Sequence, residues 1–412
     1  MNAPAPKHSV AEQFSLLRKG AAEIIPENEF RAKLEQSAKT AKPLRVYLGV
    51  DPTAPDIHLG HTVVLRKLKH FQDLGHTAVF LIGDFSAMIG DPTGQSETRP
   101  PLPREQVQQN SDTYLQQVFK ILDKKKTEVR YNSEWLGKMT AEEIVRLCSH
   151  YRLARMLERE DFRSRLEKNL PISVHELLYP LLTAYDAISL ESDVELGATE
   201  QKFNMLVHRE IQREYGRPAQ AIVTMPILVG LDGERKMSKS LGNYVGINEP
   251  PDQMFGKLMS VSDELMWSYY ELLTDFAPPV IVRLREEVRT GALHPMDAKM
   301  QLAHTIIAGF HGEDAARKAA EEFQRVFRDR RPPEEAPQHS VKISSQPLRL
   351  SALLVELGVA PSRSEAERLI KHGGVEINGE RVTEVRKEMD LSKRVDFLLR
   401  AGKKKFLRVV VE

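Results

Sequence analysis

The chain has 412 residues, a formal net charge of +1 and an ordinary share of apolar residues. This length predicts two or three domains with packed cores. The balanced charge argues against a general polyanion binder but is compatible with a local basic patch. The single cysteine, Cys148, excludes a disulfide or a cysteine-based zinc site within one chain.

The first ten residues contain no continuous apolar run, and no stretch of the sequence is apolar for long enough to cross a membrane. We therefore expect no signal peptide, no membrane association and a cytoplasmic location.

A parallel sheet is predicted near the N-terminus. Residues 11–34 have a helical pattern broken at Pro26, and residues 45–50 form a β-rich run between prolines. Residues 59–74 carry apolar side chains at a helical period and end before Gly75, and residues 78–82 form a second apolar run. Strand, helix and strand at this spacing predict a βαβ unit with a right-handed crossover.

Helical patterns dominate the following part of the chain. Residues 142–160 and 174–187 are predicted to be helical, residues 221–229 return to strand character, and residues 250–329 are helical again. Prolines and charges at residues 330–337 predict a linker.

Two short strings predict a site for the phosphates of ATP. The first, His58-Leu59-Gly60-His61, lies where a loop enters a helix, and a helix N-terminus attracts phosphate. Gly60 has no side chain, so a nucleotide can lie against the backbone there. One alternative is a pair of surface histidines. Another is a His-x-x-His zinc site, for which no third ligand lies nearby at a suggestive spacing.

The second string, Lys236-Met237-Ser238-Lys239-Ser240, follows a turn-forming stretch. Alone, it is compatible with a solvated basic loop. Together, the two strings supply cations and donors of the kind that a departing pyrophosphate requires.

These strings resemble the paired HIGH and KMSKS motifs of class I aminoacyl-tRNA synthetases. The surrounding sequence is similar to tyrosyl-tRNA synthetases from about residue 15 to the C-terminus, notably at residues 47–53, 89–94, 179–186 and 195–204. The resemblance implies an α/β fold with a Rossmann-like parallel-sheet catalytic domain. We expect that domain over residues 1–245 with a helical connecting insertion at about 100–170, a helical anticodon-binding domain over 246–329, a linker over 330–347 and a small α+β RNA-binding domain over 348–412.

The resemblance also assigns site residues. The leaving pyrophosphate would be stabilised by Thr53, His58, His61, Lys236 and Lys239. ATP would be bound by Asp51, Gly60, Glu200, Gln201, Met237 and Lys239. The phenolic hydroxyl of tyrosine would meet Tyr47 and Asp186, its ammonium group would meet Asp91 and Tyr179, and Thr183 would lie in the same pocket. ATP is expected with Mg²⁺ and without a structural metal, and the family is homodimeric, with residues 110–170 as the candidate interface.

The chemistry of tyrosine recognition agrees with these assignments. A phenol differs from a phenyl ring only in its hydrogen bonding, so a buried carboxylate is a suitable recognition group. Tyr179 and Asp186 are seven residues apart and fall on one face of a helix. A carboxylate on this otherwise apolar helix is costly to bury unpaired, whereas Tyr185 is better explained as a core aromatic.

Three positions depart from the family's pattern. The family usually has Gln at position 183 and Gly-Gly-Thr-Asp-Gln at 197–201, where this chain has Thr183, Ala198 and Glu200. Threonine is shorter than glutamine, alanine adds a methyl group where a ligand approaches the backbone, and glutamate is one methylene longer than aspartate. These changes affect amino-acid and ribose binding and leave the two phosphate motifs intact.

The C-terminal segment predicts two short helices followed by a β-hairpin with an Asn-Gly turn. It resembles the RNA-binding domain of a ribosomal small-subunit protein, which implies tRNA(Tyr), and not DNA, as partner. The candidate RNA contacts are basic residues, which a solvated charged face would also explain: Arg363, Arg368, Lys371, Lys403, Lys404 and Lys405.

We therefore expect a tyrosyl-tRNA synthetase, and three other interpretations stay open. A tryptophan-activating relative would not need Tyr47 and Asp186, because indole has no hydroxyl. An RNA-binding regulator with altered or lost catalysis is kept open by the three departures. A small-molecule nucleotidylyltransferase would not explain the C-terminal segment.

Overall fold

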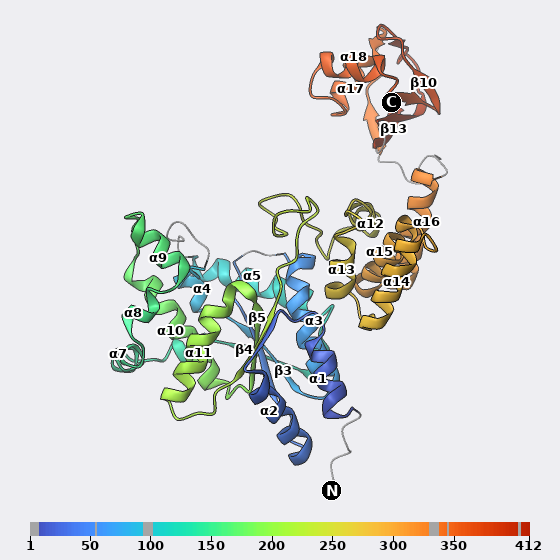
Figure 1. The fold of residues 1–412 in the computed structure, drawn as a ribbon. Coiled ribbons are helices and arrows are strands. Elements are labelled where there is room, and N and C mark those ends of the chain that lie inside the picture. The colour runs from blue at the N-terminus through green and yellow to red at the C-terminus, as the bar shows by residue number, and fades with distance from the viewer. Residues whose placement is uncertain (1–7, 54–55, 94–101, 329–337, 344–345, 403–404) are drawn as a thin grey trace. The chain divides into compact units, whose positions relative to one another are not determined.

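The computed structural model describes the chain except residues 1–7, 54–55, 94–101, 329–337, 344–345 and 403–404 (Figure 1). The chain forms two compact units, residues 1–317 and 318–412. Among the described residues, no helix is both long and apolar enough to cross a bilayer.

The first unit is built on a six-stranded sheet in the order β1-β6-β5-β2-β3-β4. The predicted strand–helix–strand unit is confirmed as β2 (Arg45–Val50), α3 (Leu59–Asp73) and β3 (Thr77–Ile82), with β2 and β3 parallel. Three further parallel strands are β4 (Thr127–Tyr131), β5 (Val194–Ala198) and β6 (Ala221–Met225), while the short β1 (Glu23–Ile25) runs antiparallel to β6. The predicted α/β class is therefore confirmed.

Helices cover both faces of this sheet. Strand order reverses at β2, so right-handed crossovers place α3 on one face and α11 (Lys202–Glu214) on the other, as Figure 1 shows. Helix α10 (Val174–Ser189) packs on the face of β2 and β3 that carries Tyr47, Val79 and Leu81. The other helices of this part are α1 (Val10–Arg18), α2 (Glu27–Thr40), α4 (Ser86–Ile89), α5 (Arg104–Val118), α6 (Ser133–Leu136), α7 (Ala141–Ser149), α8 (Leu153–Met156) and α9 (Glu160–Glu167).

Two helical predictions need correction. Residues 142–160 do not form one helix, because α7 ends at Ser149 and the chain restarts in α8 and α9. The segment 100–170, expected as a helical insertion, contains β4, which pairs with β3 and belongs to the main sheet. All five residues of β4 are only partly buried, and an edge strand of this kind lacks a continuous apolar run that would predict it.

The helical prediction for residues 250–329 is confirmed over its described part. It contains α12 (Pro251–Met259), α13 (Met266–Leu273), α14 (Pro278–Thr290), α15 (Pro295–His311) and α16 (Glu313–Phe323), followed by one π turn. Proline opens three of these helices, where its missing N–H costs no hydrogen bond. The loop after α13 contacts α3, because Asp275 accepts hydrogen bonds from Arg66 and His70.

The second unit has its own apolar core. The two predicted helices are α17 (Leu350–Glu356) and α18 (Arg363–Lys371), and the predicted hairpin is β9 (Val375–Ile377) with β10 (Glu380–Val382). Asn378 and Gly379 in its turn have φ of 50° and 85°, as a type I′ turn requires. Five strands were not predicted: β7 (Gln338–Val341), β8 (Leu348–Arg349), β11 (Glu388–Met389), β12 (Asp396–Ala401) and β13 (Lys405–Val411).

Strand β7 narrows the expected linker. It pairs in parallel with β13, so residues 338–341 belong to the sheet of the second unit. Residues 330–337, where prolines and charges predict the linker, lie outside the described part of the chain.

A buried lysine fixes α1 against α3. Lys67 is 1% exposed, and its ammonium group donates to the backbone carbonyls of Leu16, Leu17 and Lys19 at 3.4, 2.9 and 2.7 Å. These carbonyls lie at the end of α1, where a helix leaves its last C=O groups without intrahelical partners. Lys67 therefore caps α1 from a neighbouring helix.

We predict that Lys67→Met lowers the free energy of unfolding by about 2–4 kcal/mol, because three buried carbonyls lose their donor. Lys69→Met is the matched control on the same helix. Lys69 is partly exposed and pairs with Asp73, so its replacement should cost less than about 0.5 kcal/mol. Urea unfolding followed by circular dichroism measures both changes, and equal effects would contradict the capping role.

Candidate active site

A pocket lies at the carboxyl ends of the parallel strands, beside β2. In open α/β sheets, ligands bind at this edge where the strand order reverses, and here β3 and β5 lie on opposite sides of β2. The cavity has a volume of about 310 Å³. The residues that line it include some predicted to handle ATP and others predicted to bind tyrosine: Tyr47, Asp51, Thr53, His61, Asp91, Tyr179, Thr183, Asp186 and Gln201.

His58 and His61 lie ring against ring, tilted by 34°, at the N-terminus of α3. Gly60 N–H donates to His58 Nδ1 at 3.1 Å, and His58 N–H donates to His61 Nδ1 at 3.2 Å. The ring centroids lie 3.8 Å apart. Both Nδ1 atoms are acceptors, so each neutral ring carries its proton on Nε2 and presents a donor there.

Burial lowers the pKa of His58 to about 3, and the neighbouring His61 and Lys239 add to the effect. Burial and Lys239 lower the pKa of His61 to about 4, although solvent reaches the His61 side chain and weakens the shift. The two rings are therefore neutral donors near pH 7. Within the described residues, no group of three or more His, Cys, Asp or Glu side chains is placed to hold a metal ion.

The lysine string lies beside this histidine pair. Leu59 N–H donates to the carbonyl of Val245 at 2.9 Å, and a Cβ on Gly60 would lie 3.6 Å from Met237 Cβ. Lys236 pairs with Glu200 at 3.0 Å, and Lys239 pairs with Asp56 at 3.4 Å. The structure thus brings together two strings that are about 180 residues apart in the sequence.

Asp186 is a buried carboxylate with a donor on each oxygen. It is 3% exposed; Trp135 Nε1 donates to Oδ1 at 2.7 Å and Asn132 Nδ2 donates to Oδ2 at 3.3 Å. Burial raises the pKa of Asp186 well above its usual range, and these two hydrogen bonds oppose that shift. Each carboxylate oxygen keeps a lone pair that can meet a ligand.

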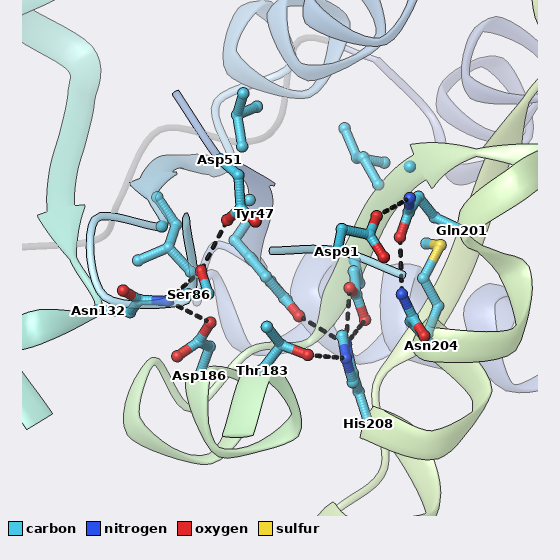
Figure 2. A pocket seen from close by; sticks show the side chains of 18 of the residues that line it. Tyr47, Asp51, Ser86, Asp91, Asn132, Thr183, Asp186, Gln201, Asn204 and His208 are labelled. Carbon is cyan, nitrogen blue, oxygen red and sulfur yellow. Dashed lines mark hydrogen bonds and ion pairs between the residues drawn. The ribbon is translucent and has the colours of Figure 1, made fainter. Parts of the chain in front are cut away.

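A hydrogen-bonded chain links Asp186 to Asp51. Asn132 Nδ2 also donates to Ser86 Oγ at 2.9 Å, and Ser86 Oγ donates to Asp51 Oδ1 at 2.6 Å (Figure 2). Tyr179, predicted to meet an ammonium group, donates its hydroxyl to Asp51 Oδ2 at 2.8 Å. Asp51, predicted to bind ATP, therefore also positions a residue of the amino-acid site.

Asp91 is held on both oxygens as well. Oδ1 accepts from the backbone N–H and hydroxyl of Thr93 at 2.9 and 2.6 Å, and Oδ2 accepts from Gln201 Nε2 at 2.8 Å. Arg159, almost fully buried, lies 3.8 Å from Asp91 and donates to Asn204 at 3.0 Å. The sequence predictions missed Arg159 and Asn204, since nothing in their local pattern separates them from ordinary polar residues of a helix.

Comparisons with known proteins assign the family. The family described as "tRNA synthetases class I (W and Y)" matches residues 39–328, and the S4 domain matches residues 348–392. The tyrosine–tRNA ligase of Geobacter sulfurreducens is 52% identical over 97% of this chain and 99% of its own length. The ligase of Geobacter metallireducens is 54% identical over 98% and 99%. The chain belongs to the tyrosine–tRNA ligase family.

A solved structure shows the same fold. The tyrosyl-tRNA synthetase of Archaeoglobus fulgidus, solved with L-tyrosine, aligns with 76% of this chain and 100% of its own, with a TM-score of 0.60 and 24% identity. Membership of this family excludes the nucleotidylyltransferase interpretation, and relatives named for tyrosine do not favour the tryptophan-activating one.

Glu195 and His208 also line the pocket and were not predicted. His208 of α11 lies between Glu195 of β5 and Thr183 of α10, and its ring nitrogens are 2.9 and 3.0 Å from these side chains (Figure 2). In the sequence, the only indication of their role is that Glu195 is a polar residue in an apolar strand and His208 lies on the apolar side of an amphipathic helix.

The structure describes four of the six residues predicted to contact RNA. Arg363, Arg368 and Lys371 are exposed on α18 of the S4 domain, and Arg368 pairs with Glu365. Lys403 and Lys404 lie outside the described residues, and Lys405 begins β13.

The lowered pKa of His58 predicts acid sensitivity. The unfolded chain takes up a proton near pH 6.5, whereas the folded protein resists protonation until about pH 3, so stability falls as the pH drops below 6.5. We expect His58 to contribute about 2 kcal/mol to the loss of stability between pH 7 and pH 5.

His58→Asn, which stays neutral at both pH values, should remove that contribution. Urea unfolding at pH 7 and pH 5 measures it. An identical pH dependence for wild type and variant would show that His58 does not resist protonation.

Proposed function

We propose that this chain activates L-tyrosine with ATP and transfers the tyrosyl group to tRNA(Tyr). One observation carries the proposal: a single pocket is lined by His61 and Thr53 near the phosphate motifs and by Tyr47 and the buried Asp186. This combination suits a reaction that joins a phenolic amino acid to a nucleotide. Family membership supports it, because the relatives are tyrosine–tRNA ligases.

In the first step, a carboxylate oxygen of tyrosine attacks the α-phosphorus of ATP. The bond from that phosphorus to the bridging oxygen breaks, and pyrophosphate leaves with its electron pair. The Nε2–H groups of His58 and His61, the Thr53 hydroxyl and the ammonium groups of Lys236 and Lys239 stabilise the charge that develops. Each preorganised donor is worth on the order of 10²-fold in rate.

The lysine string needs to exchange partners before this step. Lys236 and Lys239 are held by the carboxylates of Glu200 and Asp56. The phosphates of ATP offer more charge than either carboxylate, so they displace both. Mg²⁺ bound with the nucleotide would supply further positive charge to the phosphates.

Asp186 and Tyr47 select the substrate. The phenolic hydroxyl of tyrosine hydrogen-bonds an oxygen of Asp186 that Trp135 and Asn132 leave partly open. Phenylalanine has no hydroxyl to offer, so the lone pair of Asp186 that tyrosine would meet stays unpaired in a buried site; tyrosyl-tRNA synthetases are a known example of such discrimination. Asp91, Tyr179 and Gln201 surround the place for the ammonium group.

In the second step, a hydroxyl of the terminal ribose of tRNA attacks the carbonyl carbon of tyrosyl-adenylate, and AMP leaves. The helices of residues 246–329 and the S4 domain are the proposed tRNA-binding parts. We also propose a homodimer formed through residues 110–170 and a cytoplasmic location, where charged tRNA is used.

The function is tested by ATP–pyrophosphate exchange with tyrosine, tryptophan or phenylalanine supplied in turn. We expect exchange that depends on tyrosine. An absence of exchange in a folded protein that still binds tRNA would favour the RNA-binding regulator instead.

Replacement of Lys239 tests the lysine string. Lys239→Ala should lower the rate of exchange on the order of 10²-fold, because one charged donor to the leaving group is lost. Lys125→Ala is the control, since Lys125 is exposed near the amino end of β4, away from the pocket. Near-normal exchange by the Lys239 variant would remove this lysine from the mechanism.

Charge reversal on α18 tests the S4 domain. Arg363→Glu with Lys371→Glu should weaken tRNA(Tyr) binding and reduce the slope of log K against log salt by about 1–2, because up to two phosphate contacts are lost. Tyrosine-dependent exchange should not change. Reversals at the exposed Lys39 and Lys125 are the control, and an equal loss of binding there would point to net charge and not to this helix.

A further inference from the structure

A buried polar cluster surrounds the hydroxyl of Tyr47, and its members other than Tyr47 have no role in the steps above. It consists of Tyr47 (β2), Thr183 (α10), Glu195 (β5) and His208 (α11), with exposures of 2%, 8%, 5% and 5% (Figure 2). All four line the pocket. Glu195 and His208 are titratable groups, and burying them is costly unless they serve each other or the ligand.

The hydrogen bonds assign the protons of His208. The Thr183 hydroxyl donates to the backbone carbonyl of Tyr179 at 2.9 Å, since a carbonyl oxygen only accepts. The Thr183 oxygen, 3.0 Å from His208 Nε2, therefore accepts a hydrogen bond from that nitrogen. On the other side, Nδ1 lies 2.9 and 3.1 Å from the Glu195 oxygens. His208 and Glu195 thus share a proton between Nδ1 and the carboxyl group, and the pair as a whole carries no net charge.

This hydrogen-bonded pair lies beside the Tyr47 hydroxyl. That hydroxyl lies 3.4 Å from His208 Nδ1. Burial raises the pKa of Tyr47 well above its usual range, and the charge of the nearby Glu195 adds to this shift. His208 and Gln220 compete with the Tyr47 hydroxyl for the Glu195 oxygens, so without His208 the hydroxyl would bind Glu195 more firmly. The hydroxyl proton would then point away from the substrate.

We propose that His208 is a positioning residue for the selection of a para-hydroxylated aromatic amino acid: by neutralising Glu195 and bonding Thr183, it leaves the Tyr47 hydroxyl to the substrate. The inference rests on the tyrosine-activating function proposed above. The presence of His208 also explains the short side chain at position 183. A longer side chain there would run into the His208 ring, which already lies 3.0 Å from Thr183 Oγ1.

Two measurements on His208→Leu test the proposal. The first is equilibrium binding of tyrosine and of phenylalanine, and the second is exchange kinetics with each amino acid. We expect tyrosine affinity to fall by about 10- to 100-fold, the effect of one lost buried hydrogen bond, with little change for phenylalanine. The KM for ATP should stay within about twofold, because His208 is remote from the phosphate motifs in the bonding network.

The matched control and a conservative variant separate positioning from folding. His175→Leu makes the same change at an exposed site on α10 and should have no effect. His208→Gln supplies an amide N–H for Glu195 and should recover most of the tyrosine affinity. Thr183→Gln should lower the affinity for tyrosine, because the longer side chain runs into the ring of His208.

Two results would overturn the inference. One is unchanged discrimination between tyrosine and phenylalanine in folded His208→Leu. The other is an equal loss of affinity for both amino acids in His208→Leu and His208→Gln, which indicates a structural role only. If the wild type catalyses no exchange, the proposed function fails, and the binding measurement still decides the role of His208.

Discussion

The pocket depends on one constraint: four carboxylates are concentrated at the end of a parallel sheet, and each requires its own donors. A buried carboxylate without partners would take up a proton or disrupt the core. The structure gives each carboxylate at least two side-chain donors. These pairs are Tyr179 and Ser86 for Asp51, Thr93 and Gln201 for Asp91, Trp135 and Asn132 for Asp186, and His208 and Gln220 for Glu195.

This constraint explains what could be predicted from the sequence. The strand at residues 45–50 and the helix at 59–74 are set by local periodicity, and the two phosphate motifs are contiguous strings, so both were recognisable. The donors are different, because they come from elements scattered between residues 86 and 220. Asn132, for example, follows a partly buried edge strand, and its role exists only once that strand pairs with β3. Tertiary contacts, and not local pattern, select such residues.

Helix α3 connects the pocket to the rest of the first unit. Its N-terminus carries His58 and His61, while Arg66 and His70 bind Asp275 in the loop after α13, and Lys67 caps α1. The N-terminal end of the helix is therefore held by contacts one to three turns away. A displacement of the helical part of this unit would act on α3, and through it on the histidine pair.

The departures from the family's pattern bear on whether catalysis has been lost. A site that decays under relaxed selection accumulates polar groups without partners, whereas each polar change here has one. Thr183 is bonded by His208, and the longer Glu200 reaches Lys236 at 3.0 Å. Among the described residues, no side chain of the pocket has a buried polar atom without a partner. Changes that satisfy one another in this way fit an active site that has been readjusted, and they argue against a regulator that merely retains the fold of an enzyme.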